Sequence, residues 1–222
     1  MMLESQPKAM RKSINSVFQS TTRNRLPAVF FIIFIVSNMF LIGELMDNSF
    51  ITKELGERNP YPKELYEISM KFTMAFYYCE DHFFSRRCSI RESDTYSNRI
   101  LSIVEDECSP VITETFKFFQ GRYMEGEMAR HRLYALTMQE EGGDLTGLAE
   151  AIYRNLENSD GDIHAMLSVC LKVIIRLRHN LLHDNKYEAM IGEPEEQKIL
   201  INRGYMLLSS LLFARNTKLA VV

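Results

Sequence analysis

The sequence predicts an all-α protein, a helical bundle, and three observations lead to this prediction. Apolar residues recur at helical spacing in several segments, and no stretch shows the alternation of a β-strand. Glycine and proline are scarce, at 10 and 6 of 222 residues, which disfavours a turn-rich β architecture. Finally, 46% of the residues are hydrophobic and 25% are charged, as is ordinary for a folded globular chain that buries a core.

The first half of the chain begins with a polar, basic arm. Residues 1–25 carry five basic side chains against one acidic, and a short helix is expected at 10–18. An apolar helix follows at 26–46. The GERNPYP stretch breaks the chain, and Pro62 suits the first turn of a helix at 63–85. That helix is predicted to be largely buried, because a wide apolar stripe runs along it: Leu65, Tyr66, Ile68, Met70, Phe72, Phe76, Tyr77, Cys79 and Phe83.

The second half is predicted to hold six further helical segments. A short helix is expected at 94–107, and Ser109-Pro110 reads as a cap and first-turn proline of a helix that reaches Tyr123. After a segment at 127–139, Asp144 is placed to cap a helix that ends at Asn155. The last two helices are expected at 163–183 and 195–214. The domain prediction is a basic arm, 1–25, followed by a single helical domain, 26–222.

The apolar segment from Leu26 to Met46 has two interpretations. It is nearly as long as the roughly 20 apolar residues that cross a bilayer, with arginines before it and carboxylates after it. Ser37 and Asn38 interrupt it, however, and an uninterrupted run as short as Leu26–Val36 is more typical of a buried core helix. A core helix in a cytoplasmic protein is the prediction, and a membrane anchor through 26–46 is the alternative.

The net charge, the cysteine spacing and the absence of several known motifs exclude some classes of function. A formal net charge of −3 argues against a protein that coats nucleic acid, although it allows a local basic cleft. The four cysteines form no C-x-x-C pair, so reduced thiols are expected and a zinc site or disulfide framework is not. Phosphate-binding glycine loops and the G-x-S-x-G motif of serine hydrolases are absent from the sequence. No cofactor or metal is predicted.

The helix at 163–183 carries the most informative residues. An apolar stripe runs along it: Ile163, Leu167, Cys170, Leu171, Ile174, Leu177 and Leu181. Beside this stripe, Arg178 stands where an apolar residue would be expected. A guanidinium next to a buried face needs a partner, because losing its hydration is costly. A carboxylate, an RNA phosphate or a facing subunit would serve.

His183 follows Arg178 by five residues, about 140° round an ideal helix. The two side chains converge only if the helix ends near His183, as Asp184 and Asn185 suggest. The pair suits metal-free cleavage of RNA. Histidine titrates near neutral pH and can transfer protons, while arginine binds two phosphate oxygens through its planar fork. Asn180 is placed to bind a phosphate or to orient the histidine.

The segment Arg178-His179-Asn180-Leu181-Leu182-His183, with Lys186 after it, resembles the R-x(4–6)-H active-site motif of HEPN-domain ribonucleases. The resemblance extends less specifically to the aromatic stretch at 34–40 and to the charged-then-apolar segment after Gln197. It implies a HEPN-like helical bundle that cleaves RNA without metal, leaving a 2′,3′-cyclic phosphate and a 5′-hydroxyl. It also implies a homodimer with one composite site, and a role as a toxin paired with an antitoxin protein, in phage defence or in RNA processing.

Within this resemblance, Arg178 and His183 are the candidate catalytic residues. His179, Asn180, Arg176 and Lys186 are candidate supporting or RNA-binding residues. Arg176 also fits the looser R-x6-H spacing with His183, and Arg178 is favoured because a polar residue follows it directly.

Two other interpretations of the same residues are kept. Basic side chains at a helix C-terminus complement its dipole, so the protein is alternatively a non-catalytic helical interaction or dimerisation protein. His179 and His183 also have the i, i+4 spacing of helical zinc ligands, but the glutamate of H-E-x-x-H is missing.

Overall fold

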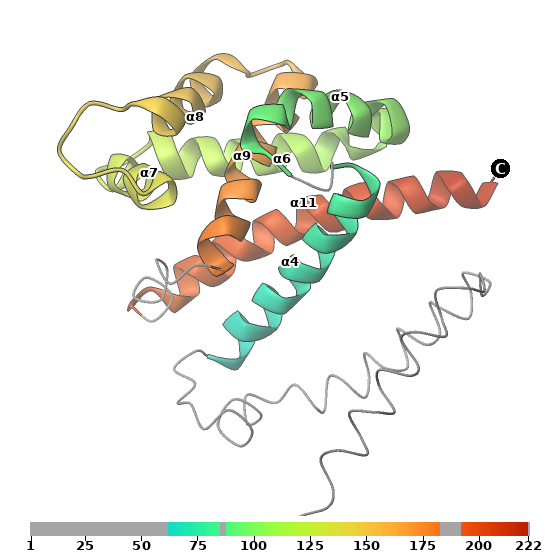
Figure 1. Cartoon of the computed structure of the whole chain (residues 1–222), viewed down its shortest axis with the longest axis horizontal. Helices are drawn as coiled ribbons and strands as arrows, with labels where there is room; N and C mark the ends of the chain where they lie inside the picture. The colour runs from blue at the N-terminus through green and yellow to red at the C-terminus, as the bar shows by residue number, and fades with distance from the viewer. Residues whose placement is uncertain (1–61, 85–87, 183–191, 222) are drawn as a thin grey trace, which may run out of the picture. The chain divides into compact units, whose positions relative to one another are not determined.

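The computed structural model describes residues 62–84, 88–182 and 192–221, which all belong to one compact unit, Pro60–Val222. These residues form seven α-helices and two short 3₁₀-helices, with no strand among them (Figure 1). In chain order the elements are α4 (Lys63–His82), η1 (Ile90–Glu92), α5 (Ser93–Val104), η2 (Glu105–Cys108), α6 (Ser109–Met124), α7 (Ala129–Thr137), α8 (Gly147–Asn158), α9 (Ile163–Leu182) and α11 (Pro194–Val221). The predicted all-α bundle is confirmed.

The basic arm 1–25, the apolar segment 26–46 and the boundary between them lie outside the described residues. Among the helices of the described part, none is long and apolar enough to cross a membrane.

Proline and glycine place most helix boundaries near their predicted positions, with three differences. Ser109 is the first residue of α6 and not its cap, while Pro110 does lie in the first turn. Asp144 does not cap α8, which begins at Gly147 after Thr146; the Asp144 carbonyl instead accepts a hydrogen bond from Gln139 Nε2 at 2.6 Å. The last helix also continues beyond residue 214, to Val221.

Helix α9 lies at the centre of the unit, and α5, α6, α7 and α8 pack around it (Figure 1). The predicted stripe is buried or partly buried along its whole length, from Ile163 to Leu181. Side chains on other faces of α9 are buried too: Met166, Val169, Val173 and Ile175. A helix that is apolar on nearly all sides belongs in a core, and that is where α9 lies.

Helices α4 and α11 form a parallel pair at one side of the unit. Lys198 Nζ contacts Glu64 Oε2 at 2.8 Å near the two helix starts, and the Cys79 thiol points to the Leu208 carbonyl further along. Between these points Gly204 faces the fully buried ring of Phe72. A Cβ atom at Gly204 would lie 2.9 Å from Phe72 Cε2, so the absent side chain is what lets the helices approach.

A polar network joins α5 to α9. The Ser168 hydroxyl on α9 donates to Asp94 Oδ1 at the start of α5 and lies 3.3 Å from the Ser93 hydroxyl. Lys172 Nζ donates to Ser168 Oγ at 2.9 Å and lies 3.4 Å from Asp94 Oδ1. Ser93 and Ser168 are buried, and because the single proton of Ser168 goes to Asp94, its oxygen is left to accept from Lys172 and from the Ser93 hydroxyl.

We expect Gly204→Ala to destabilise the unit, although alanine is the better helix former. The added methyl group meets the fully buried Phe72 ring, which must shift. Overpacking of this kind costs about 1–3 kcal/mol, more than the roughly 1 kcal/mol gained in helix propensity. Urea denaturation measures the change. Gly121→Ala is the matched control, because its Cβ would meet only the Glu125 side chain at 3.8 Å. Equal or higher stability of Gly204→Ala would contradict the close packing.

We expect Asp94→Asn to lower stability more at neutral pH than in acid. The hydrogen bond from Ser168, aided by the Lys172 ammonium, holds the pKa of Asp94 below its usual range. A lowered carboxyl pKa stabilises the fold above the unfolded-state value of about 3.9, and this contribution disappears as the pH falls through the folded-state pKa. Because the carboxylate is 68% exposed, the effect should stay below about 1 kcal/mol. Urea denaturation at pH 7 and pH 3 measures it, and a double-mutant cycle with Ser168→Ala isolates the pair.

Candidate functional site

The last two turns of α9 send polar side chains to two opposite sides. Arg176 and Asn180 reach α7, whereas Arg178 reaches α4. Residues two apart on a helix point about 200° away from each other, so this division follows from helical geometry. The two candidate arginines of the motif therefore have different surroundings.

Arg176 and Asn180 bind the C-terminal end of α7. Arg176 Nε donates to the Leu136 carbonyl at 3.1 Å, and its Nη2 donates to the Thr137 carbonyl at 3.2 Å. Asn180 Nδ2 donates to the same Leu136 carbonyl at 2.8 Å. Carbonyls in the last turn of a helix lack partners within that helix, and a cation there also favours the helix dipole. Both side chains therefore hold α7 against α9.

This geometry bears on the first of the two roles expected for Asn180, binding a phosphate, whereas its orienting of His183 stays a prediction. The residue is 1% exposed, so a phosphate cannot reach its amide in this conformation. Its Oδ1 atom is buried and has no hydrogen-bond partner among the described residues. Arg176 is partly buried, and burial lowers the pKa of its guanidinium. Both Arg176 hydrogen bonds go to backbone carbonyls of α7, so we assign Arg176 to packing.

Arg178 lies against the last turns of α4. Its Nη2 atom is 3.7 Å from Glu80 Oε2, and its guanidinium carbon is 5.4 Å from the centre of the Phe76 ring. The partner that the sequence left open is therefore a carboxylate and an aromatic face of the same chain. The Arg178 side chain is still 37% exposed, and a guanidinium has five N–H donors. Arg178 can hold the Glu80 contact and present further donors to an anion.

The two histidines of the motif are placed differently. His179 is exposed on the last turn of α9. His183 and Lys186 lie outside the described residues, so the expected convergence of His183 with Arg178 stays a prediction. The described residues contain no group of three His, Cys, Asp or Glu side chains positioned to hold a metal ion.

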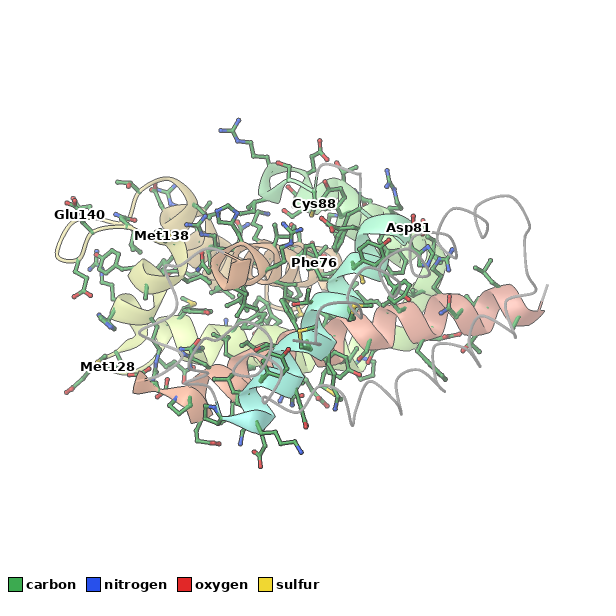
Figure 2. The ribbon with its side chains drawn as sticks, turned by 60° about the horizontal axis from the view of Figure 1, so that its bottom comes forward. Phe76, Asp81, Cys88, Met128, Met138 and Glu140 are labelled. Carbon is green, nitrogen blue, oxygen red and sulfur yellow. The ribbon has the colours of Figure 1, made fainter. Side chains whose placement is uncertain are left out.

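Cys88 lies in the electrostatic field of the same group. Figure 2 shows it near the C-terminal end of α4, where Phe76 and Asp81 are also labelled. Burial, followed by the negative charge of Glu80, raises the pKa of the Cys88 thiol to about 12, and the Arg178 charge opposes this rise. Cys79, Cys108 and Cys170 are buried, so Cys88 is the most accessible of the four thiols.

Phe76 and Glu80 belong to the site because both contact Arg178, although the sequence alone does not mark them as site residues. The sequence places Phe76 in the buried stripe, which the structure confirms. The available signal was their i, i+4 spacing, which places both on one face of α4. The sequence gives no sign that this face of α4 meets the end of α9. The contact joins Glu80 to Arg178, which lie about a hundred positions apart in the chain.

We expect Glu80→Gln to make Cys88 react faster with iodoacetamide at pH 8. Removing the negative charge lowers the pKa of the thiol, which raises the fraction of the reactive thiolate. Mass spectrometry of the alkylated peptide gives the rate. Glu67→Gln, also on α4, is the control and should leave the rate unchanged. An unchanged rate in Glu80→Gln would mean that Glu80 does not face Cys88.

No protein-family model, curated protein or solved structure matches this chain. A function for this chain therefore has to be inferred from the side chains at the end of α9 and from their neighbours in α4 and α7. Among them, Arg178 combines a fixed position, a positive charge and exposure to solvent.

Proposed function

We propose that the protein is a metal-independent endoribonuclease of the HEPN type, with Arg178 binding the scissile phosphate and His183 transferring protons. The observation that supports it most is the placement of Arg178, which Phe76 and Glu80 orient while more than a third of its side chain stays exposed. An arginine that served packing alone would be expected to direct its donors inward, as Arg176 does.

The reaction follows from the chemistry of these side chains. The ribose 2′-hydroxyl loses a proton and attacks the adjacent phosphorus, and the 5′-oxygen leaves and gains a proton. The products are a 2′,3′-cyclic phosphate and a 5′-hydroxyl. Arg178 stabilises the charge on the phosphate oxygens, since a guanidinium binds two of them at once. His183 acts as general acid or base near neutral pH.

A homodimer accounts for the need for two proton-transfer groups. Each chain supplies one His183, whereas the reaction requires both a base and an acid. A composite site in which two copies of the motif face each other provides both. RNA is then the substrate, and an antitoxin protein is the partner expected if the enzyme is a toxin. Phage defence and RNA processing are the other roles that suit the same activity.

A second candidate is a non-catalytic helical interaction or dimerisation protein, possibly anchored to a membrane through 26–46. The observation that favours it is that every described polar residue of the motif already has an intrachain role or contact. Arg178 pairs with Glu80, and Arg176 and Asn180 hold the end of α7. Under this candidate, wild-type protein does not cleave RNA.

We expect Arg178→Ala and His183→Ala each to lower RNA cleavage by about a hundredfold or more, because each removes a group that acts on the reacting phosphate. The folded state should change little in Arg178→Ala, since a partly exposed ion pair contributes about 0–1 kcal/mol and an exposed cation–π contact about 0.5–1 kcal/mol. Cleavage of a labelled single-stranded RNA in EDTA, together with urea denaturation, measures both quantities.

Arg176→Ala is the matched control for Arg178→Ala. It removes a donor from the Thr137 carbonyl and one of the two donors to the Leu136 carbonyl, which keeps Asn180, and should cost about 1–3 kcal/mol of stability, while the remaining folded protein still cleaves. Arg178→Lys keeps the charge and loses the planar fork, so it should restore activity only in part. Full activity of the His183→Ala protein in EDTA would exclude the proposed mechanism.

A further inference from the structure

Tyr77 on α4 is exposed, although the sequence predicts it to be part of the buried stripe. The side chain is 62% exposed, whereas Phe72, Phe76 and Cys79 of the same helix are fully buried. Tyrosine is enriched where proteins bind partners, because its ring is apolar at one end and polar at the other, so an exposed tyrosine on α4 is a candidate binding residue.

Tyr77 is adjacent to the residues that orient Arg178. It directly follows Phe76, whose ring lies under the Arg178 guanidinium, and it precedes Glu80 by three residues. Residues three apart on a helix have Cβ atoms about 5–6 Å from each other. The Tyr77 ring therefore stands one turn of helix away from the carboxylate that contacts Arg178.

The Tyr77 ring is also restrained. It packs against Tyr78 with ring centres 5.6 Å apart and an angle of 72° between the planes, an edge-to-face arrangement. The neighbour fixes the ring while most of its surface stays open to solvent. A restrained, exposed aromatic ring binds a planar group with little loss of side-chain entropy.

We propose that Tyr77 stacks on a nucleobase of a single-stranded RNA whose phosphate is bound by Arg178. This inference rests on the proposed ribonuclease function and extends it to how the substrate is held. Proteins recognise single-stranded RNA by stacking unpaired bases on aromatic side chains, and such stacking tolerates different sequences because every base has a flat face.

The charges on this part of α4 make stacking the more suitable source of affinity. Glu80 and Asp81 both carry negative charge here, and the Asp81 side chain is 73% exposed. The chain as a whole has a net charge of −3. Residues 77–81 carry no basic side chain that would attract the RNA backbone, and an uncharged aromatic contact beside Arg178 avoids repulsion.

Binding of an RNA that cannot be cleaved tests the proposal. The probe is a short single-stranded oligonucleotide with 2′-O-methyl groups, which lack the attacking hydroxyl, and with the fluorescent base 2-aminopurine. We expect wild-type protein and Tyr77→Phe to bind it and to quench its fluorescence. Tyr77→Ala should bind about tenfold or more weakly and lose the quenching, because a single base–aromatic stack has an effect of this size.

Met74→Ala is the control, since Met74 is an exposed apolar residue of the same helix, at 47%, but has no ring. It should bind as wild type does. Equal binding by Tyr77→Ala and wild type would overturn the inference and leave the proposed function intact. Binding with stacking but no cleavage of unmodified RNA would instead contradict the proposed function. Absence of any binding by wild-type protein would contradict both the inference and the proposed function. A changed oligomeric state of Tyr77→Ala in light scattering would assign the ring to a subunit interface and overturn the inference.

Discussion

The burial of α9 on nearly every side is the constraint on which the rest of the unit depends. Four helices surround α9, and the side chains of several of its faces are buried, among them Leu167, Val169 and Val173. A central helix of this kind favours polar side chains that find a partner, because an unpaired polar group in a core is costly. In the middle of α9, Ser168 and Lys172 meet this requirement through Asp94.

The same requirement sorts the side chains at the end of α9. Arg176 and Asn180 donate hydrogen bonds to carbonyls at the end of α7 and so join the two helices. The groups that make these bonds are not available to a ligand. Arg178 faces the opposite way and meets α4, which packs mainly on α11 and leaves the guanidinium partly open. The division between a packing arginine and an accessible one thus comes from a rotation of about 200° along a single helix.

Helix positions were predictable because local signals mark them. Pro62, Pro110 and the loop around Gly142 interrupt the chain where helices begin or end, and the stripe on α9 repeats at helical spacing. Smaller errors arose where local signals compete. Asp144 and Thr146 are both suitable caps before α8, and only the path of the loop, where Gln139 binds the Asp144 carbonyl, selects between them. The spacing of Tyr77 fits the stripe, yet among the described residues the buried side chains of α4 lie on one face and Tyr77 lies outside it.

The sequence by itself determined the all-α class, the order and approximate limits of the described helices, and the motif that makes Arg178 the residue of interest. These are local properties, set by spacing and by helix-breaking residues. Only the tertiary structure decided that Arg176 and Asn180 serve packing, that Glu80 and Phe76 orient Arg178, and that Tyr77 lies open beside them. Each of these facts depends on which helices become neighbours, and such contacts join residues far apart in the chain.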